Sequence, residues 1–407
     1  MGKKHLSSKW LAVGIILLFV GTGIIPAIAQ ETEKSLQTSR GTWLYVGGSG
    51  PGNYTKIQDA IDNASEGDTV FVYSDSSPYY GNVIVNKSIH LIGEDQASTI
   101  IDGMYYTNTI WIPSSLVYVC NFTVINCRND LFSAGIFVTE KLSWPLPDPP
   151  ASSDVHIVNC IVKNNSCGIR FINTRNSEVA SCDIHHNLGH SIYMNNGSYI
   201  TIHDCYIHEN GQVVPEGYYS GGVIISDQEW LEGSDNIFIS HCKIINNVWS
   251  GITIDRGSIN INIESNVIKE NTYFGIFIWD ISSKKTLSNI SISNNNVSYN
   301  GINLYGGGIG LQGCKKSVEI TQNNIIDNHD GVYLLRSSFN SIFENNLIGN
   351  YRNAFFKSFC FLNHWDKNYW NDWQGLGPKL IKGKLSVIPW MNFDWHPAQE
   401  PYDAPGT

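Results

Sequence analysis

Residues 200–210 read ITIHDCYIHEN, and the pattern within them decides the fold. Ile202 is followed three residues later by Cys205, then by Ile207, and three residues beyond that by Asn210. The same order of aliphatic residue, Cys or Asn, aliphatic residue and Asn occurs eight times between Val155 and Asn350. A fixed period of this kind predicts a solenoid. Its Cys or Asn position is filled in turn by Cys160, Cys182, Cys205, Cys242, Asn266, Asn295, Asn323 and Asn345.

The repeating unit is about 22 to 24 residues long where no loop interrupts it, and it contains no helical period. Alternating isoleucines precede each Cys or Asn, as at Ile237 and Ile239, which is typical of a strand with one buried face. Three short strands per coil predict an all-β fold, a right-handed parallel β-helix, over residues 43–350. Buried Asn and free Cys side chains would stack in interior columns.

The ends of a β-helix need caps, because open strand edges pair with other chains. Thr55 and Gln58 form a capping-box pattern that predicts a short N-terminal helix ending before Gly67. Its buried face is expected to consist of Ile57, Ala60, Ile61 and Ala64.

Residues 351–407 are predicted to form the C-terminal cap, because the repeat ends at Asn350 and aromatic residues follow. These aromatic side chains either seal the end of the solenoid or stack on sugar rings, and we favour the seal. The residues concerned are Trp365, Tyr369, Trp370, Trp373, Trp390 and Trp395.

Residues 1–29 have the features of a signal peptide: early lysines, an apolar stretch and a small-residue cleavage site at 27–29. If uncleaved, this segment would be an N-terminal anchor and the only membrane contact we expect. Residues 30–42 are predicted to be a linker. The protein is therefore expected to be secreted, extracellular or attached to the cell envelope.

The net charge of −10 and the absence of a basic run argue against nucleic-acid binding. Nine cysteines in an exported chain invite disulfides, but stacked free thiols fit better. Neighbours in one column have parallel Cβ directions, which suit disulfide geometry badly. Cys120 is expected to begin the column that Cys160 continues.

Histidines gather in two successive coils. His185 and His208 occupy equivalent outward positions and should stack, and Asp183 lies on the same face as His185. Two imidazoles and a carboxylate suit zinc or copper. The alternative is a solvated outer face with no ligand.

A second set of polar residues lies at the ends of the last strands of successive coils. Asp227, Asp255 and Asp280 fall within one position of each other, Arg256 adjoins Asp255, and Trp230 lies in an inserted loop. Such an acidic edge would bind a glycan or calcium, or supply an acid and a base for polysaccharide cleavage. The alternative is ordinary turn aspartates.

Several stretches resemble known β-helix proteins. The segments YTKIQDAIDNASEGDTVFV and VIVNKSIHLIGEDQASTIIDG resemble the N-terminal entry of pectin-lyase-like proteins, and the NNxxxGI coils resemble NosD-type repeats. The tail NHWDKNYWNDWQGLGPKLIKG resembles the end of archaeal NosD-like surface proteins. The NosD resemblance implies a role in copper handling. The NTD, DD, GHG and RIK motifs of pectate lyases and polygalacturonases do not occur, so no catalytic residue is carried over.

We therefore expect a non-catalytic exported β-helix that binds a glycan or another cell-surface polymer. Its binding edge would comprise Asp227, Trp230, Asp255, Asp280 and the loops at 143–153 and 211–222. The alternatives are a polysaccharide lyase or glycoside hydrolase using the same edge with Arg256, and a copper-binding accessory protein using His185 and His208.

Overall fold

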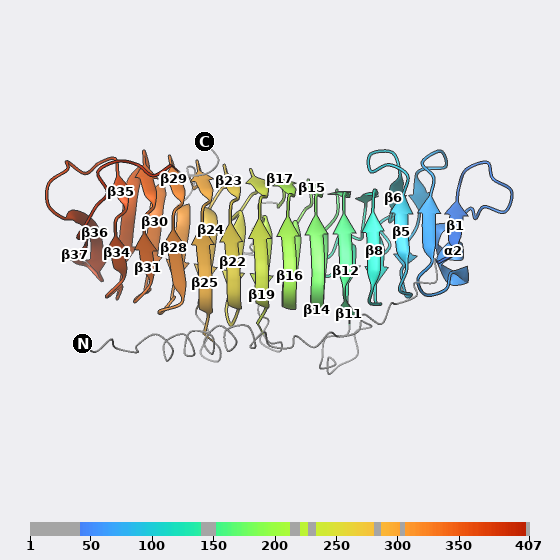
Figure 1. Cartoon of the computed structure of the whole chain (residues 1–407), viewed down its shortest axis with the longest axis horizontal. Helices are drawn as coiled ribbons and strands as arrows, with labels where there is room; N and C mark the ends of the chain where they lie inside the picture. Colours follow the sequence, from blue (N-terminus) through green and yellow to red (C-terminus); the bar gives the residue numbers. More distant parts are fainter. Residues whose placement is uncertain are drawn as a thin grey trace, which may run out of the picture. The chain divides into compact units, whose positions relative to one another are not determined.

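The repeats form the coils of a parallel β-solenoid, in which the strands of successive coils stack side by side (Figure 1). This computed structural model describes residues 41–139, 152–211, 220–226, 233–280, 286–301 and 306–403. The predicted signal peptide or anchor, nearly all of the linker, and the residues Asp227 and Trp230 lie outside these ranges.

Each complete coil contributes a first, a middle and a last strand. The middle strands stack into one sheet, whereas the stack of first strands and the stack of last strands are joined into one set of 25 strands. We refer to these two stacks as the first sheet and the last sheet. The middle sheet has 12 strands. They are β3 (Tyr79–Tyr80), β6 (Ile100–Asp102), β9 (Thr123–Ile125), β13 (Ile161–Lys163), β15 (Asp183–His185), β17 (Tyr206–His208), β20 (Lys243–Ile245), β23 (Val267–Lys269), β26 (Asn296–Ser298), β29 (Asn324–Ile326), β32 (Asn346–Ile348) and β35 (Tyr369–Trp370).

The first sheet is made of the strands that precede the repeated Cys or Asn. They are β1 (Trp43–Val46), β2 (Thr69–Val72), β5 (His90–Gly93), β8 (Val117–Cys120), β12 (Val155–Val158), β14 (Cys167–Ala180), β16 (Ile192–His203), β19 (Asp235–Ser240), β22 (Ile259–Glu264), β25 (Ser288–Ser293), β28 (Val318–Thr321), β31 (Ser341–Phe343), β34 (His364–Asp366) and β37 (Ile388–Asp394).

The last sheet includes the N-terminal parts of the long strands β14 and β16, which pass from one sheet into the other. Its further strands are β4 (Val83–Ile84), β7 (Ile110–Ile112), β10 (Ala134–Val138), β18 (Val223–Ser226), β21 (Ile252–Asp255), β24 (Phe274–Trp279), β27 (Gly307–Gln312), β30 (Asp330–Leu335), β33 (Arg352–Lys357) and β36 (Lys379–Leu385), and the short β11 (Ser152–Ser153) pairs with β14.

Interior asparagines form columns that satisfy their amides completely. Asn295 donates from Nδ2 to the carbonyls of Ile263 and Ser293, at 2.8 and 2.9 Å, and to Oδ1 of Asn323 at 3.0 Å. Its own Oδ1 accepts the backbone N–H and the side-chain amide of Asn266, both at 3.0 Å. Because each buried group has a partner one coil away, the column costs no unsatisfied hydrogen bonds.

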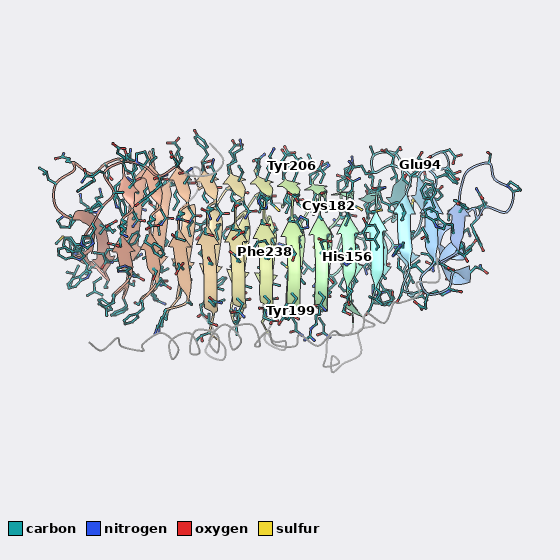
Figure 2. The ribbon with its side chains drawn as sticks, viewed as in Figure 1. Glu94, His156, Cys182, Tyr199, Tyr206 and Phe238 are labelled. Carbon is teal, nitrogen blue, oxygen red and sulfur yellow. The ribbon has the colours of Figure 1, made fainter. Side chains whose placement is uncertain are left out.

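The thiol interpretation is confirmed, since all nine cysteines are buried and unpaired. Figure 2 shows Cys182 within this run of strands. Within the column the thiols contact carbonyls, as Cys205 Sγ does with His203 at 3.2 Å. The predicted start at Cys120 is wrong. Cys120 pairs with Val158, so Phe122, two residues later, takes the place above Cys160.

From Asn121 to Lys367, the corner after each first and each middle strand is turned by a residue with positive φ placed just before the column residue. Asp204 (φ 54°) precedes Cys205, and Glu209 (φ 53°) precedes Asn210. Few of these corner residues are glycine. The left-handed conformation costs an ordinary residue on the order of 1 kcal/mol, and the paired strands on either side hold it in place.

The N-terminal helix forms as predicted, but the capping box does not. Helix α2 spans Ile57–Asn63 with Lys56 at the N-cap position and no side-chain cap hydrogen bond. Gln58 instead binds the first coils through its side chain, accepting from the N–H of Ile84 at 2.8 Å. The expected apolar face is buried. The helix therefore seals the end by packing rather than by a self-contained capping motif.

At the other end, parallel pairing continues beyond Asn350. Strands β33, β34 and β35 stack on β30, β31 and β32, so residues 352–370 form a further coil. An antiparallel hairpin of β36 and β37 then closes the solenoid. Asp394, fully buried, ends the Asn column by accepting from Asn368 and from the indole of Trp370, each at 3.0 Å.

Candidate functional site

The histidine cluster lies on the middle sheet, on β15 and β17. Their register pairs His185 with His208 and places Ile184 and Ile207 in the core, so both histidines face outward. The two rings stack at 4.9 Å with an angle of 12° between their planes. His208 Nε2 lies 3.0 Å from Asp183 Oδ1. The predicted stacking of the two histidines is therefore confirmed.

One potential ligand atom from each of Asp183, His185 and His208 lies within 4.8 Å of the other two, and among the described residues this is the one such group of three. Burial lowers the pKa of His185, an effect that Asp183 partly offsets and the neighbouring histidines reinforce. A neutral imidazole is the form that binds metals. The donor set therefore fits zinc or copper.

Corner residues surround this cluster with further donors. His186 Nδ1 lies 2.7 Å from His185 Nδ1, and Glu209 Oε2 lies 3.1 Å from His208 Nδ1. The ring of Tyr206 stacks on His208 at 3.9 Å. Such contacts fix imidazole orientation in metal sites. Figure 2 places Tyr206 at the edge of the solenoid, so the cluster faces outward.

A second histidine network lies on the first sheet and was not predicted as a unit. Glu178 contacts His156 and His203, each at 2.8 Å, and His203 also contacts Asp204 at 2.7 Å. The hydrogen bonds from His156 and His203 lower the pKa of Glu178. Those to Asp204 and Glu178 raise the pKa of His203. These opposite pKa shifts are those expected when a carboxylate and an imidazolium stabilise each other, so the cluster is a surface ion network.

Only part of the predicted acidic edge lies in the described ranges. Asp255 ends β21 in register with Trp279, so it lies one position from Asp280. Arg256 Nε is 3.4 Å from Asp255 Oδ1, and Asp280 Oδ2 accepts from the backbone N–H of Leu287. Within those ranges neither aspartate belongs to a group of three possible metal ligands, and the calcium site stays a prediction.

The aromatic cap divides into two sets. Trp365 and Trp370 are 2% and 1% exposed and lie 5.8 Å apart, which confirms the sealing interpretation for them. Trp373 is half-buried against the same core. Trp390 and Trp395 are 45% and 64% exposed, so they do not contribute to the seal in the same way.

A groove that the sequence did not reveal lies on the outer face of the last sheet, over β24, β27, β30 and β33. Its volume is about 330 Å³, within the range of about 300–1,000 Å³ usual for ligand pockets. A larger hollow of about 620 Å³ adjoins it and shares Arg352 and Phe355. The two hollows together offer an extended surface rather than a closed pocket.

Aromatic rings stack along the groove from coil to coil. Phe274, Tyr333 and Phe355 follow one another with centroid separations of 6.1 and 6.2 Å and interplanar angles of 30° and 17°. The buried Phe277, on the same strand as Phe274, stacks on that ring at 5.1 Å. Gly310 makes this possible, because a Cβ there would lie 2.7 Å from the Phe274 ring. The result is an apolar floor in which the rings of Tyr333 and Phe355 are partly exposed and that of Phe274 packs beneath them.

Charged side chains surround that floor. Arg352 binds Asp330 through both Nε and Nη2, at 2.5 and 2.6 Å, and its guanidinium lies 4.1 Å from the Phe355 ring centre. Lys357 and Lys384 pair in register and are exposed. The sequence did carry one signal for this groove: aromatic residues recur at one outward position of the last strand, at Phe277, Tyr333 and Phe355.

Comparisons with known proteins find similarity to two family models. The model for a right-handed β-helix region matches residues 150–307 and 230–348, and the model named periplasmic copper-binding protein (NosD) matches residues 61–228. No curated protein is significantly similar to the chain.

Solved structures of similar fold include two A-modules of mannuronan C-5 epimerases from Azotobacter vinelandii. AlgE4 is 16% identical, with a TM-score of 0.58, covering 73% of this chain and 92% of that one. AlgE6 is 15% identical, with a TM-score of 0.53, covering 73% and 90%. The Dettilon tailspike protein is 13% identical, with a TM-score of 0.50, covering 77% and 68%. At these identities the likeness shows the fold alone.

The chain is therefore a right-handed parallel β-helix protein, as the repeat predicted. Within that class it is a NosD-like protein. An archaeal origin stays a prediction. In the part of the chain that the structure describes, no helix is both long and apolar enough to cross a membrane.

Proposed function

We propose that this NosD-like protein is an exported carbohydrate-binding β-helix that holds a glycan along the outer face of its last sheet. The aromatic groove supports this proposal most directly. A floor of stacked rings with a few polar groups at its edge is the usual composition of a site for small or extended ligands. The epimerase modules of similar fold are named for mannuronan, a polysaccharide.

The predicted acidic edge belongs to the same sheet as the groove. Trp279, in register with Asp255, lies 6.4 Å from Phe277, the buried ring that stacks on Phe274 of the groove. A glycan chain extending from the groove along the sheet would therefore meet Asp255 and Asp280. Asp227 and Trp230 remain proposed contacts of the same ligand.

A glycan array followed by titration tests this function. Phe355→Ala removes one ring of the floor, and we expect an affinity loss of about 10-fold, since a stacked aromatic contact contributes about 0.5–1.5 kcal/mol beyond the area it buries. Tyr199→Ala is the matched control, because that ring is 56% exposed and lies outside the groove. Absence of any glycan ligand would remove the proposal.

The same incubations distinguish a binding protein from an enzyme. Unsaturated products or new reducing ends would favour a lyase or hydrolase that uses Asp227, Asp255, Asp280 and Arg256. Substitution of Asp255 by Asn would then abolish product formation while binding persists. Intact glycan after prolonged incubation supports the non-catalytic scaffold.

A second candidate function is metal handling, which the group of Asp183, His185 and His208 favours. The match to the copper-binding family model spans all three residues. Calorimetric titration with copper and with zinc is expected to give a site that His185→Ala/His208→Ala removes. His364→Ala, an exposed histidine outside the cluster, is the control. No heat with either metal would end this candidate.

A further inference from the structure

The charges around the aromatic groove are unequal, and the inequality identifies a class of ligand. Among the described residues that line the groove, one carboxylate, Asp330, faces three permanent cations, Arg352, Lys357 and Lys384. The whole chain carries a net charge of −10. The groove is therefore a local positive site on an acidic protein.

Asp330, the single carboxylate, cancels at most one of the three positive charges that the groove offers to a ligand. Asp330 has a side chain only 5% exposed and is bound in bidentate fashion by Arg352. Its charge is committed to fixing that guanidinium against the Phe355 ring. Asp330 is thus a positioning residue, and Arg352 keeps the donors on Nη1 that Asp330 does not take.

Lys357 and Lys384 supply the excess charge. They are partners in the register of β33 and β36, one coil apart, so their side chains lie on one outward row at a spacing of roughly 5 Å. Both are exposed, and no carboxylate in the described ranges forms an ion pair with either. Two unpaired ammonium groups beside an apolar floor are complementary to a ligand made of sugar rings that carry negative charge.

We infer that the groove selects an acidic polysaccharide, whose sugar rings lie on the aromatic floor while carboxylate or sulfate groups contact Lys357 and Lys384. This inference rests on the proposed glycan-binding function and makes it narrower. Like-charge repulsion from the rest of the protein would disfavour binding elsewhere, and a positive groove in an acidic surface concentrates an anionic ligand where it is recognised.

The test uses the full chain and three probes of similar length: oligogalacturonate, sulfated dextran and neutral dextran. Titration is expected to show at least one acidic probe binding about tenfold more tightly than dextran, with affinity falling as salt rises. Preference between the two acidic probes distinguishes carboxylate from sulfate as the recognised group.

Variants locate the effect. Lys357→Gln/Lys384→Gln is expected to lose about tenfold in affinity for the acidic probe, because it removes both exposed charges that contact the ligand. Lys315→Gln/Lys316→Gln makes the same charge change at two exposed lysines outside the groove and should leave affinity unchanged. Both variants alter exposed side chains, so neither should unfold the protein.

The possible failures are distinguishable. Equal binding of dextran and acidic probes overturns the inference and leaves the glycan-binding function intact. Equal losses in the groove variant and the control variant also overturn it, because the attraction would then be general. Binding of none of these probes, together with an empty glycan array, removes the proposed function itself.

Discussion

The two halves of this solenoid have the same backbone geometry but differ in the side chains of the interior column and of the outer face. In the N-terminal half the interior column that follows the first strands contains thiols, and histidines lie on the outer face. In the C-terminal half the same column contains amides, and the aromatic groove lies on the outer face. Each thiol makes weak contacts with carbonyls, whereas each amide completes a hydrogen-bonded ladder. The comparison teaches that one coil geometry tolerates two interior chemistries, which should differ in stability and reactivity.

The largest expected difference concerns thiol reactivity. Burial raises the pKa of Cys127 to about 11 and that of Cys167 to about 12, so little thiolate is present at neutral pH. We expect alkylation of the native protein to be slower than that of the urea-unfolded protein by at least about 1,000-fold. Mass spectrometry of iodoacetamide-treated samples measures this. Rapid labelling of Cys182, a column thiol whose pKa is also raised by burial, would contradict a closed column.

The next effect is the loss of one amide from the Asn half. Asn295→Ala leaves Asn266 without its acceptor and two carbonyls without their donor, so we expect a destabilisation of about 3–5 kcal/mol. Urea unfolding measures it, and hydrogen exchange at the Asn266 amide localises it. The control is Glu319→Ala, an exposed residue on β28, which should change stability by less than about 0.5 kcal/mol.

The matching change in the Cys half should cost less. Cys205→Ala removes a small buried side chain whose thiol is a weak donor to carbonyls at 3.2 and 3.6 Å, and we expect about 1–2 kcal/mol. The same urea assay applies. A cost equal to that of Asn295→Ala would break the comparison, because the two chemistries would then contribute equally.

The smallest effect is the pH dependence of the outer histidine network. The pKa of His203 is raised, so its stabilisation is complete below its unfolded pKa, near 6.5, and is lost as pH rises above that value. The pKa of Glu178 is lowered, so its contribution is lost as pH falls below about 4.5. The network therefore stabilises most between these values.

Solvent screening limits this contribution to a few tenths of a kcal/mol, roughly. His203→Gln should flatten the stability profile between pH 6 and pH 8, as measured by thermal unfolding. The control is His90→Gln, an exposed histidine outside the network. An unchanged profile in His203→Gln would show that the network has no energetic role.

The features that the repeat itself determines could be predicted from the sequence. The coil period fixes the register, so the stacking of His185 on His208 and the burial of the column residues could be predicted. The start of the column could not be predicted, because the sequence around Cys120 allows two registers. One places Cys120 in the column, and the other, found in the structure, turns the corner at Asn121 and places Phe122 there. Non-repeating segments gave less, as the capping box shows.

The groove was missed for a different reason. Its floor combines an outward row of aromatic residues with Phe274, whose ring reaches into the space left by Gly310. That space exists only after the coils are stacked, and no local pattern marks it. Lys384 comes from the antiparallel hairpin, which breaks the period and therefore could not be placed from it.

The left-handed corners have a consequence for how such a protein can change. Because most corners are turned by a non-glycine residue in the left-handed conformation, the corner position carries a side chain. Successive coils therefore present these side chains at equivalent positions on the surface. His186 and Glu209 are two such residues, and both border the histidine cluster. A substitution at a corner can therefore alter surface chemistry one coil at a time, without disturbing the columns that hold the solenoid together.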